Sequence, residues 1–170
     1  MQHLLVIRHA LAVAREEFAR TGRDDALRPV TAEGARTMRR AAAGLARIIP
    51  GIDLLAASPF VRTAQTAGIV AAAYGGLDVR TVDVLAPGGS QDDILRWLHR
   101  QREARAIALV GHEPDLGALV SWLLADVSRS FVELKKGAAC LLRFQSRPAP
   151  GRATLRWALA PAQLRRVGRG

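Results

Sequence analysis

The run His3-Leu4-Leu5-Val6-Ile7-Arg8, at residues 3–8, decides the fold class of this chain. A compact apolar run of this length is typical of a buried strand. Similar runs at residues 54–57, 79–85 and 105–110 alternate with amphipathic stretches that have helical spacing. This strand–helix alternation predicts an α/β fold, a three-layer α/β/α sandwich whose central sheet is mainly parallel.

Capping and stop residues set the expected helices. Thr31 caps a helix that ends before Pro50-Gly51, and Ser58-Pro59 begins a second helix with Ser as its N-cap. Two later helices begin at Ser90 and at Glu113-Pro114. The other expectations are a polar loop with one helical turn over residues 14–29 and a closing hairpin of strands 132–144 and 152–159.

The chain of 170 residues suits one domain, expected over residues 1–162, with a basic tail over 163–170 that frays. Its single cysteine, Cys140, lies in an apolar run and is expected to be a buried structural thiol. No apolar run is long enough to cross a bilayer, and the N-terminus lacks the features of a signal peptide. We therefore expect a cytoplasmic protein without a membrane partner.

The formal net charge is +10, and almost all of the positive charge is arginine. Such a charge favours anionic partners through long-range steering. The arginines are dispersed, however, and aromatic residues make up only 5% of the chain, so no basic run is interleaved with aromatics. The charge is compatible with an anionic substrate, while a nucleic-acid partner is not expected.

Polar side chains follow three of the expected strands. The first strand ends in Arg8-His9, the second is followed by Ser58 and Arg62, and the fourth is followed by His112. Ligands of parallel α/β sheets bind beyond the carboxyl ends of the strands, which open onto one edge. Two histidines and two arginines are therefore expected to converge there.

This combination suits phosphoryl chemistry. Arginine forks match the oxygens of a phosphoryl group, and helix N-termini add donors for an anion. A neutral imidazole is a competent nucleophile for phosphorus. No carboxylate-rich cage accompanies the cluster, so we expect neither a metal nor a cofactor, and we interpret His3 and His99 as bystanders.

Four segments of the chain together resemble the histidine phosphatase superfamily, whose fold is phosphoglycerate mutase-like, and within it the short SixA-type phosphohistidine phosphatases. They are Leu5-Val6-Ile7-Arg8-His9-Ala10, Arg28-Pro29-Val30-Thr31-Ala32-Glu33-Gly34, Ala57-Ser58-Pro59-Phe60-Val61-Arg62-Thr63-Ala64-Gln65-Thr66-Ala67 and Val110-Gly111-His112-Glu113-Pro114. The resemblance implies that His9 is transiently phosphorylated and that water hydrolyses the intermediate. It makes Arg8, Arg62 and His112 the phosphate pocket, with Arg28 as an additional pocket residue.

The chain departs from the family pattern at two places. Ala10 stands where the family usually has glycine, and the region after the third strand lacks the glutamate that larger members use as a general acid. Asp83, Asp92 and Glu113 are candidate substitutes, none in a clearly matching place. An alkoxide leaves poorly without a proton donor, whereas an imidazole, with a pKa of about 6.5, can leave already protonated.

The absent acid and the short chain, which leaves no room for a large lid, favour a histidine-phosphorylated protein as substrate. A small-molecule phosphatase acting on a sugar phosphate or nucleotide is the first alternative. A non-catalytic phosphopeptide-binding module is the second, although a binding module would not require both histidines.

Overall fold

A six-stranded sheet crosses the middle of the molecule, in the order β3 (Val79–Thr81), β2 (Leu54–Ala57), β4 (Ala106–Gly111), β1 (Gln2–Arg8), β5 (Ala139–Phe144) and β6 (Thr154–Leu159). The computed structural model describes residues 2–168. Its helices are α1 (Arg15–Ala19), α2 (Ala32–Ile48), α3 (Val61–Ala73), α4 (Gln91–Arg100), α5 (Asp115–Ala125) and α6 (Pro161–Val167). Two short 3₁₀ turns, Asp25–Leu27 and Asp83–Leu85, complete the elements.

The four strands from β3 to β1 run parallel to one another, and β5 and β6 are antiparallel additions at one edge. The expected mainly parallel sheet is therefore confirmed. β4 lies between β1 and β2, although it follows both in the sequence. This crossover sets the carboxyl ends of the three strands next to each other.

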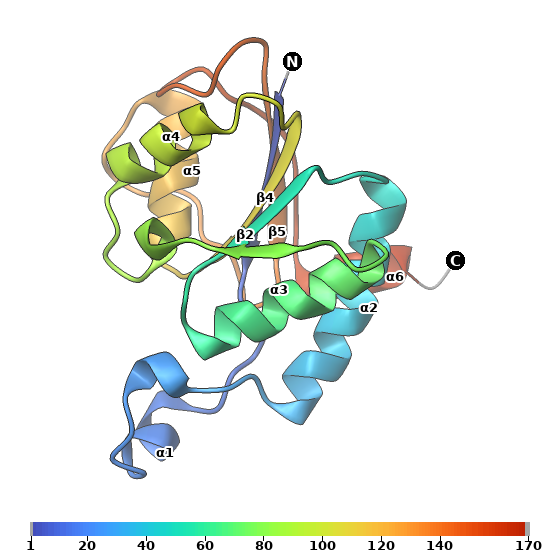
Figure 1. Ribbon diagram of the computed structural model, residues 1–170, viewed down its shortest axis with the longest axis vertical. Helices are drawn as coiled ribbons and strands as arrows, with labels where there is room; N and C mark the ends of the chain where they lie inside the picture. The colour runs from blue at the N-terminus through green and yellow to red at the C-terminus, as the bar shows by residue number, and fades with distance from the viewer. Residues whose placement is uncertain (1, 169–170) are drawn as a thin grey trace.

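Helices cover both faces of the sheet (Figure 1). Along β1, Leu5 and Ile7 pack with Met38 and other residues of α2, α3 and α6. Leu4 and Val6 point to the opposite face, where they pack with residues of α4 and α5. Successive strand side chains alternate between faces, so one apolar strand contributes to both cores.

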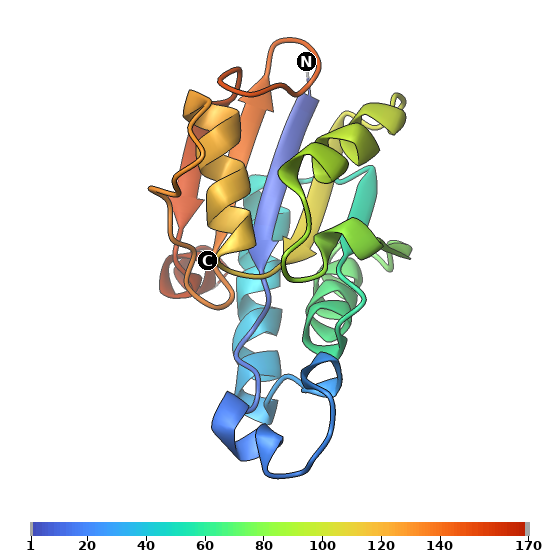
Figure 2. The ribbon, with the colours of Figure 1, turned by 90° about the vertical axis from the view of Figure 1, so that its left-hand side faces the viewer.

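The segment that carries α1 and the turn Asp25–Leu27 projects beyond the carboxyl end of β1 (Figure 2). An isolated β-bridge between Ala12 and Val30 closes the base of this lobe. The expectation of a polar loop with a helical turn is confirmed here.

The end of the chain differs from its expected structure in two places. The strand expected from residue 132 begins only at Ala139, because the preceding segment bonds to Glu113 and to Ser121 of α5 rather than to a strand. The tail was expected to fray from Gln163, but the chain forms α6 as far as Val167. The fully buried Leu164 packs α6 against α2, and residues 169–170 of the expected tail lie outside the described range.

Two local expectations are also corrected. Only Val79–Thr81 of the run at 79–85 is a strand, and Asp83–Leu85 forms a 3₁₀ turn. Ser58 is not the N-cap of α3, because that helix begins at Val61 and Phe60 is its N-cap. By contrast, the Thr31 cap is confirmed, since its hydroxyl accepts the N–H of Gly34 at 2.9 Å.

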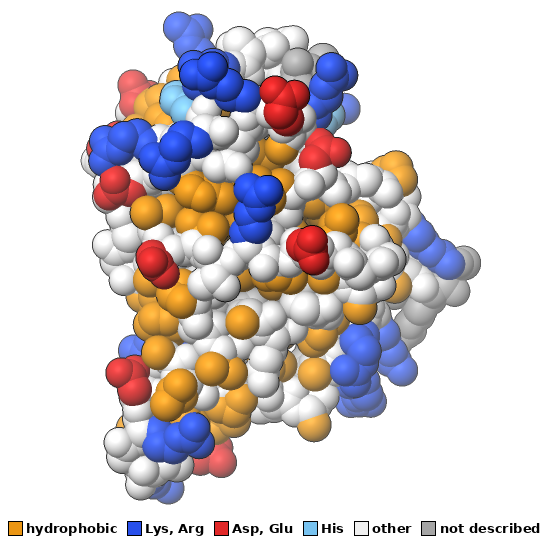
Figure 3. Space-filling model, in the orientation of Figure 1, with side chains coloured by type: hydrophobic (Ala, Val, Ile, Leu, Met, Phe, Trp, Pro, Cys, Tyr) orange, Lys and Arg blue, Asp and Glu red, His pale blue; other side chains and the backbone are white. Residues whose placement is uncertain are grey.

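Within residues 2–168 the structure has no helix that is long and apolar enough to cross a membrane. Figure 3 shows Lys and Arg side chains scattered over one face of the molecule among acidic and apolar ones. On that face the positive charge is as dispersed as the sequence suggests.

Candidate active site

The strand register brings the polar strand ends together. Arg8 pairs with Gly111, and the N–H of His9 donates to the Gly111 carbonyl at 3.1 Å. On the other side of β4, the N–H of Ser58 donates to the carbonyl of Val110 at 3.1 Å. Arg62 is the second residue of α3 and is only 2% exposed. The four residues expected to converge, Arg8, His9, Arg62 and His112, therefore lie at one edge of the sheet.

His9 is a buried imidazole held in one tautomer. Its Nδ1 lies 2.7 Å from the carbonyl oxygen of Ala10, and because a carbonyl can only accept, Nδ1 carries the proton. Burial lowers the pKa of His9 to about 4; the bond to Ala10 acts against this, and the charges of Arg62, Arg8 and Arg28 add to it. At neutral pH His9 is uncharged, and its Nε2 carries the lone pair.

His112 lies beside His9, with ring centroids 5.4 Å apart and an interplanar angle of 56°. Its Nε2 is 2.9 Å from the hydroxyl of Ser58. The serine that was expected to cap α3 therefore bonds this histidine instead. Phe60 contacts the ring edge-on at a centroid distance of 5.2 Å. Burial, followed by the charge of Arg62, lowers the pKa of His112 to about 3, so this ring is neutral as well.

A carboxylate from the projecting lobe joins two buried arginines. Asp25 accepts from Nη2 of Arg62 at 3.1 Å and from Nε of Arg28 at 2.8 Å, while its backbone carbonyl accepts Nη1 of Arg62 at 2.9 Å. Burial raises the pKa of Asp25, but the bond from Arg28 and the charges of Arg62 and Arg28 outweigh it and hold the pKa below its usual value. Arg28 thus contacts the cluster through Asp25, and its part in binding phosphate stays a prediction.

Asp25 was not among the residues predicted for the site from the sequence. It lies in a polar loop with a neighbouring acid, Asp24, and nothing in the spacing separates the two. The one available signal is its place three residues before Arg28 at a short helical turn, where the two side chains can meet.

Arg8 completes the cluster from the end of β1, where its Nη1 donates to the carbonyl of Leu134 at 2.6 Å. Among residues 2–168, five buried side-chain N or O atoms have no hydrogen-bond partner, and three of them belong to this site. These three are Nε of Arg8, Nε of Arg62 and Nδ1 of His112. Buried polar atoms normally find partners, so this concentration of unpaired nitrogens indicates a binding site for an acceptor.

The two acids proposed as general acid lie in different settings. Asp83 is exposed in the 3₁₀ turn after β3, a strand that lies three positions from β1 in the sheet. Glu113 follows His112 directly, but its Oε1 accepts the N–H of Leu134 at 2.9 Å. Asp92, the third acid considered, is in the first turn of α4.

No group of three or more His, Cys, Asp or Glu residues within 2–168 has the arrangement of a metal site. Cys140 is fully buried, and burial raises the pKa of its thiol to about 12, as suits a structural residue.

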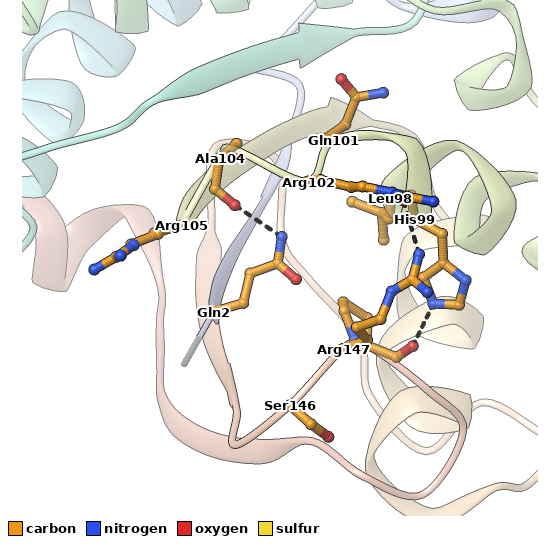
Figure 4. A pocket seen from close by; sticks show the side chains of 10 residues that line it. Gln2, Leu98, His99, Gln101, Arg102, Ala104, Arg105, Ser146 and Arg147 are labelled. Atoms are coloured by element: carbon orange, nitrogen blue, oxygen red, sulfur yellow. Dashed lines mark hydrogen bonds between the residues drawn. The ribbon is translucent and has the colours of Figure 1, made fainter.

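A cavity of about 690 Å³ lies away from His9 and His112, at the start of β1 and the end of α4. His99 bonds the carbonyl of Pro148 there, and Arg147 donates to the carbonyl of His99 in the last turn of α4 (Figure 4). Cations are favoured at the negative C-terminal end of a helix, which suits the position of Arg147. Both side chains are thus used to hold the helix end, and the cavity contains none of the expected site residues.

Comparison with known proteins agrees with this geometry. Residues 4–86 match the family model described as "Histidine phosphatase superfamily (branch 1)". An uncharacterized protein of Picosynechococcus sp. is 33% identical over 142 residues, which cover 82% of this chain and 84% of that protein. The chain belongs to the histidine phosphatase superfamily.

Solved structures of two kinds of phosphatase share the fold. The protein histidine phosphatase SixA, complexed with tungstate, is 21% identical with a TM-score of 0.80, covering 96% of this chain and 99% of that one. A candidate α-ribazole-5′-P phosphatase from Escherichia coli is 17% identical with a TM-score of 0.76, covering 94% and 97%. The phosphoglycerate mutase-like α/β/α sandwich expected from the sequence is confirmed, and family and neighbours together support a phosphatase.

Proposed function

We propose that this protein is a metal-independent phosphatase that removes phosphate from phosphohistidine on a protein, with His9 as the nucleophile. The observation that carries the proposal is the set of three buried, unpaired nitrogens on Arg8, Arg62 and His112 beside a neutral His9. Two guanidinium groups supply positive charge, and a His112 whose Nδ1 holds the proton supplies a third donor. Such a group matches the three non-bridging oxygens of a phosphoryl group.

Phosphoryl transfer in this site needs mainly positioning and charge neutralisation. Nε2 of His9 attacks phosphorus, and the bond from phosphorus to the imidazole nitrogen of the substrate breaks. The electron pair leaves with that imidazole, which carries a proton. Water then attacks the phosphorus of phospho-His9 and releases inorganic phosphate, which regenerates the free imidazole.

The substrate class follows from the acids around the site. Asp83 is exposed in the turn after β3 and makes no hydrogen bond to His9 or His112, and an oxygen of Glu113 is already engaged by a backbone N–H, so neither is held in place as a proton donor for a poor leaving group. A substrate imidazole, with a pKa of about 6.5, does not need such a donor at neutral pH. This difference favours N–P over C–O–P cleavage, and the fold shared with SixA supports the same choice.

A small-molecule phosphatase is the second candidate, favoured by the fold shared with the α-ribazole-5′-P phosphatase candidate. A histidine-phosphorylated carrier protein, a sugar phosphate and an aryl phosphate, tested in the presence of a chelator, separate the two. Preference for the N–P substrate, lost in His9→Ala, is the expected result. Preference for the sugar phosphate would keep His9 as nucleophile and reject the substrate class.

A labelling experiment with the same proteins tests the nucleophile itself. Acid-labile, alkali-stable radioactivity should appear on the parent protein after brief exposure to a labelled substrate, because phosphohistidine has that stability. The His9→Ala protein should bind phosphate or tungstate but acquire no label. Undiminished turnover by His9→Ala would reject the mechanism, and binding without turnover by the parent would leave a phosphopeptide-binding module.

A further inference from the structure

Glu113 lies between the edge of the sheet that carries His9 and His112 and the segment that follows α5. Its carboxylate accepts the N–H of Leu134 at 2.9 Å and also lies beside Gly117 in the first turn of α5. Burial raises the pKa of Glu113, while the bond from the Leu134 N–H, the charge of Arg8 and the nearby N–H of Gly117 act in the opposite direction. The carboxylate therefore joins α5 to a segment that has no strand or helix of its own.

The Leu134 peptide continues the connection to the phosphate pocket. Its N–H bonds to Glu113, and its carbonyl accepts Nη1 of Arg8 at 2.6 Å. The side chain of Leu134 is 3% exposed and packs in the core with α5, so this peptide has little freedom to move by itself. One backbone unit thus lies between the carboxylate and the guanidinium.

Close packing around Gly117 holds the same segment against the helix. A Cβ on Gly117 would lie 2.2 Å from the carbonyl oxygen of Val132 and 2.9 Å from Oε2 of Glu113. The glycine is needed because the segment and the carboxylate occupy that space. Oε1 of Glu113 therefore accepts the N–H of Leu134, and Oε2 is confined beside Gly117.

We propose that Glu113 is a positioning residue, which orients Arg8 through the Leu134 peptide and does not protonate the leaving group. With Nη1 held by Leu134, the guanidinium is fixed so that its buried and unpaired Nε can donate to a phosphoryl oxygen, with Nη2 as a further donor. The inference rests on the proposed function for the identity of the ligand, but it concerns a different residue and a different step.

Three variants test the inference: Glu113→Ala, Glu113→Gln and, as a control, Glu133→Gln, an exposed carboxylate of the same segment. They are compared on aryl phosphates whose leaving groups range from good to poor, and in tungstate affinity. Glu113→Ala should lower kcat/KM about 10- to 100-fold, as expected for loosening one charge-assisted hydrogen bond to the phosphoryl group. The loss should be equal for all leaving groups, and tungstate binding should weaken in parallel.

Glu113→Gln keeps an oxygen that can accept from Leu134 and should recover most of the loss, and Glu133→Gln should behave as the parent. A general acid predicts a different pattern, in which Gln fails like Ala and the loss grows as the leaving group becomes poorer. That pattern, or an unchanged Glu113→Ala protein, would overturn the inference.

Coupling to Arg8 gives a readout that does not depend on turnover. If Glu113 acts through Arg8, the double variant Glu113→Ala, Arg8→Ala should bind tungstate no more weakly than Arg8→Ala alone. Additive losses would overturn the inference. Because anion binding alone is measured, a parent without phosphatase activity would reject the proposed function and still leave Glu113 tested.

Discussion

The two buried histidines should make the stability of this protein fall steeply between pH 7 and pH 5. Burial lowers the pKa of His9 to about 4 and that of His112 to about 3, so both remain neutral in the folded protein at pH 5. In the unfolded chain each has a pKa of about 6.5 and takes up a proton over the same interval. The unfolded state therefore binds more protons, and the free energy of unfolding decreases as the pH falls.

The size of the effect is set by the unfolded chain, because the folded pKa values lie well below pH 5. Protonation of one unfolded histidine between pH 7 and pH 5 is worth about 2 kcal/mol, so the two together remove about 4 kcal/mol. This is a large part of the stability of an ordinary domain, about 5–15 kcal/mol. The loss begins near pH 6.5 and continues to about pH 4, where His9 starts to titrate in the folded state.

Urea unfolding at pH 7 and pH 5, in buffers without phosphate, measures the effect. Each of the variants His9→Gln and His112→Gln should lose about 2 kcal/mol less than the parent between the two pH values, whatever its stability at pH 7. Arg156→Gln on the exposed face of β6 serves as a control that should retain the full dependence. If the variant that lacks both histidines lost as much stability between pH 7 and pH 5 as the parent, the buried imidazoles would not be the source of the pH dependence.

Three further changes probe the packing of the site and of the chain end. Asp25→Ala leaves the buried Arg62 without its carboxylate and should lower the free energy of unfolding in urea by about 2 kcal/mol. The loss is smaller than for a fully buried pair because Asp25 is partly exposed. Added tungstate should restore more stability to the variant than to the parent. Gly44→Ala puts a Cβ against the carbonyl oxygen of Leu164 in α6. Thermal unfolding should therefore show a loss of at least about 2 kcal/mol in the free energy of unfolding, and an unchanged Tm would contradict that contact. Ser58→Ala removes the partner of Nε2 on His112 and should cost about 1–2 kcal/mol with weaker tungstate binding, whereas a neutral effect in both assays would mean that the bond contributes nothing.

Much of the fold could be predicted from local patterns. The apolar run that became β1, the Thr31 cap of α2 and the helical spacing beyond it are decided by neighbours along the chain. The expectations that failed depended on distant partners. The segment before Ala139 is apolar enough for a strand, but Glu113 binds its backbone, and the basic tail becomes helical because Leu164 finds an apolar surface on α2.

The candidate site divides in the same way. Arg8, His9, Arg62 and His112 stand at strand ends or at the start of a helix, and parallel strands open onto one edge, so the sequence by itself determined that they would meet. It could not determine that Asp25 would also reach Arg62, or that Ser58 would bond a histidine instead of capping a helix. Those contacts join residues 37 and 54 positions apart in the chain. Only the tertiary structure decides them, because side-chain hydrogen bonds require atoms within about 3 Å, a condition that the packing of separate elements creates.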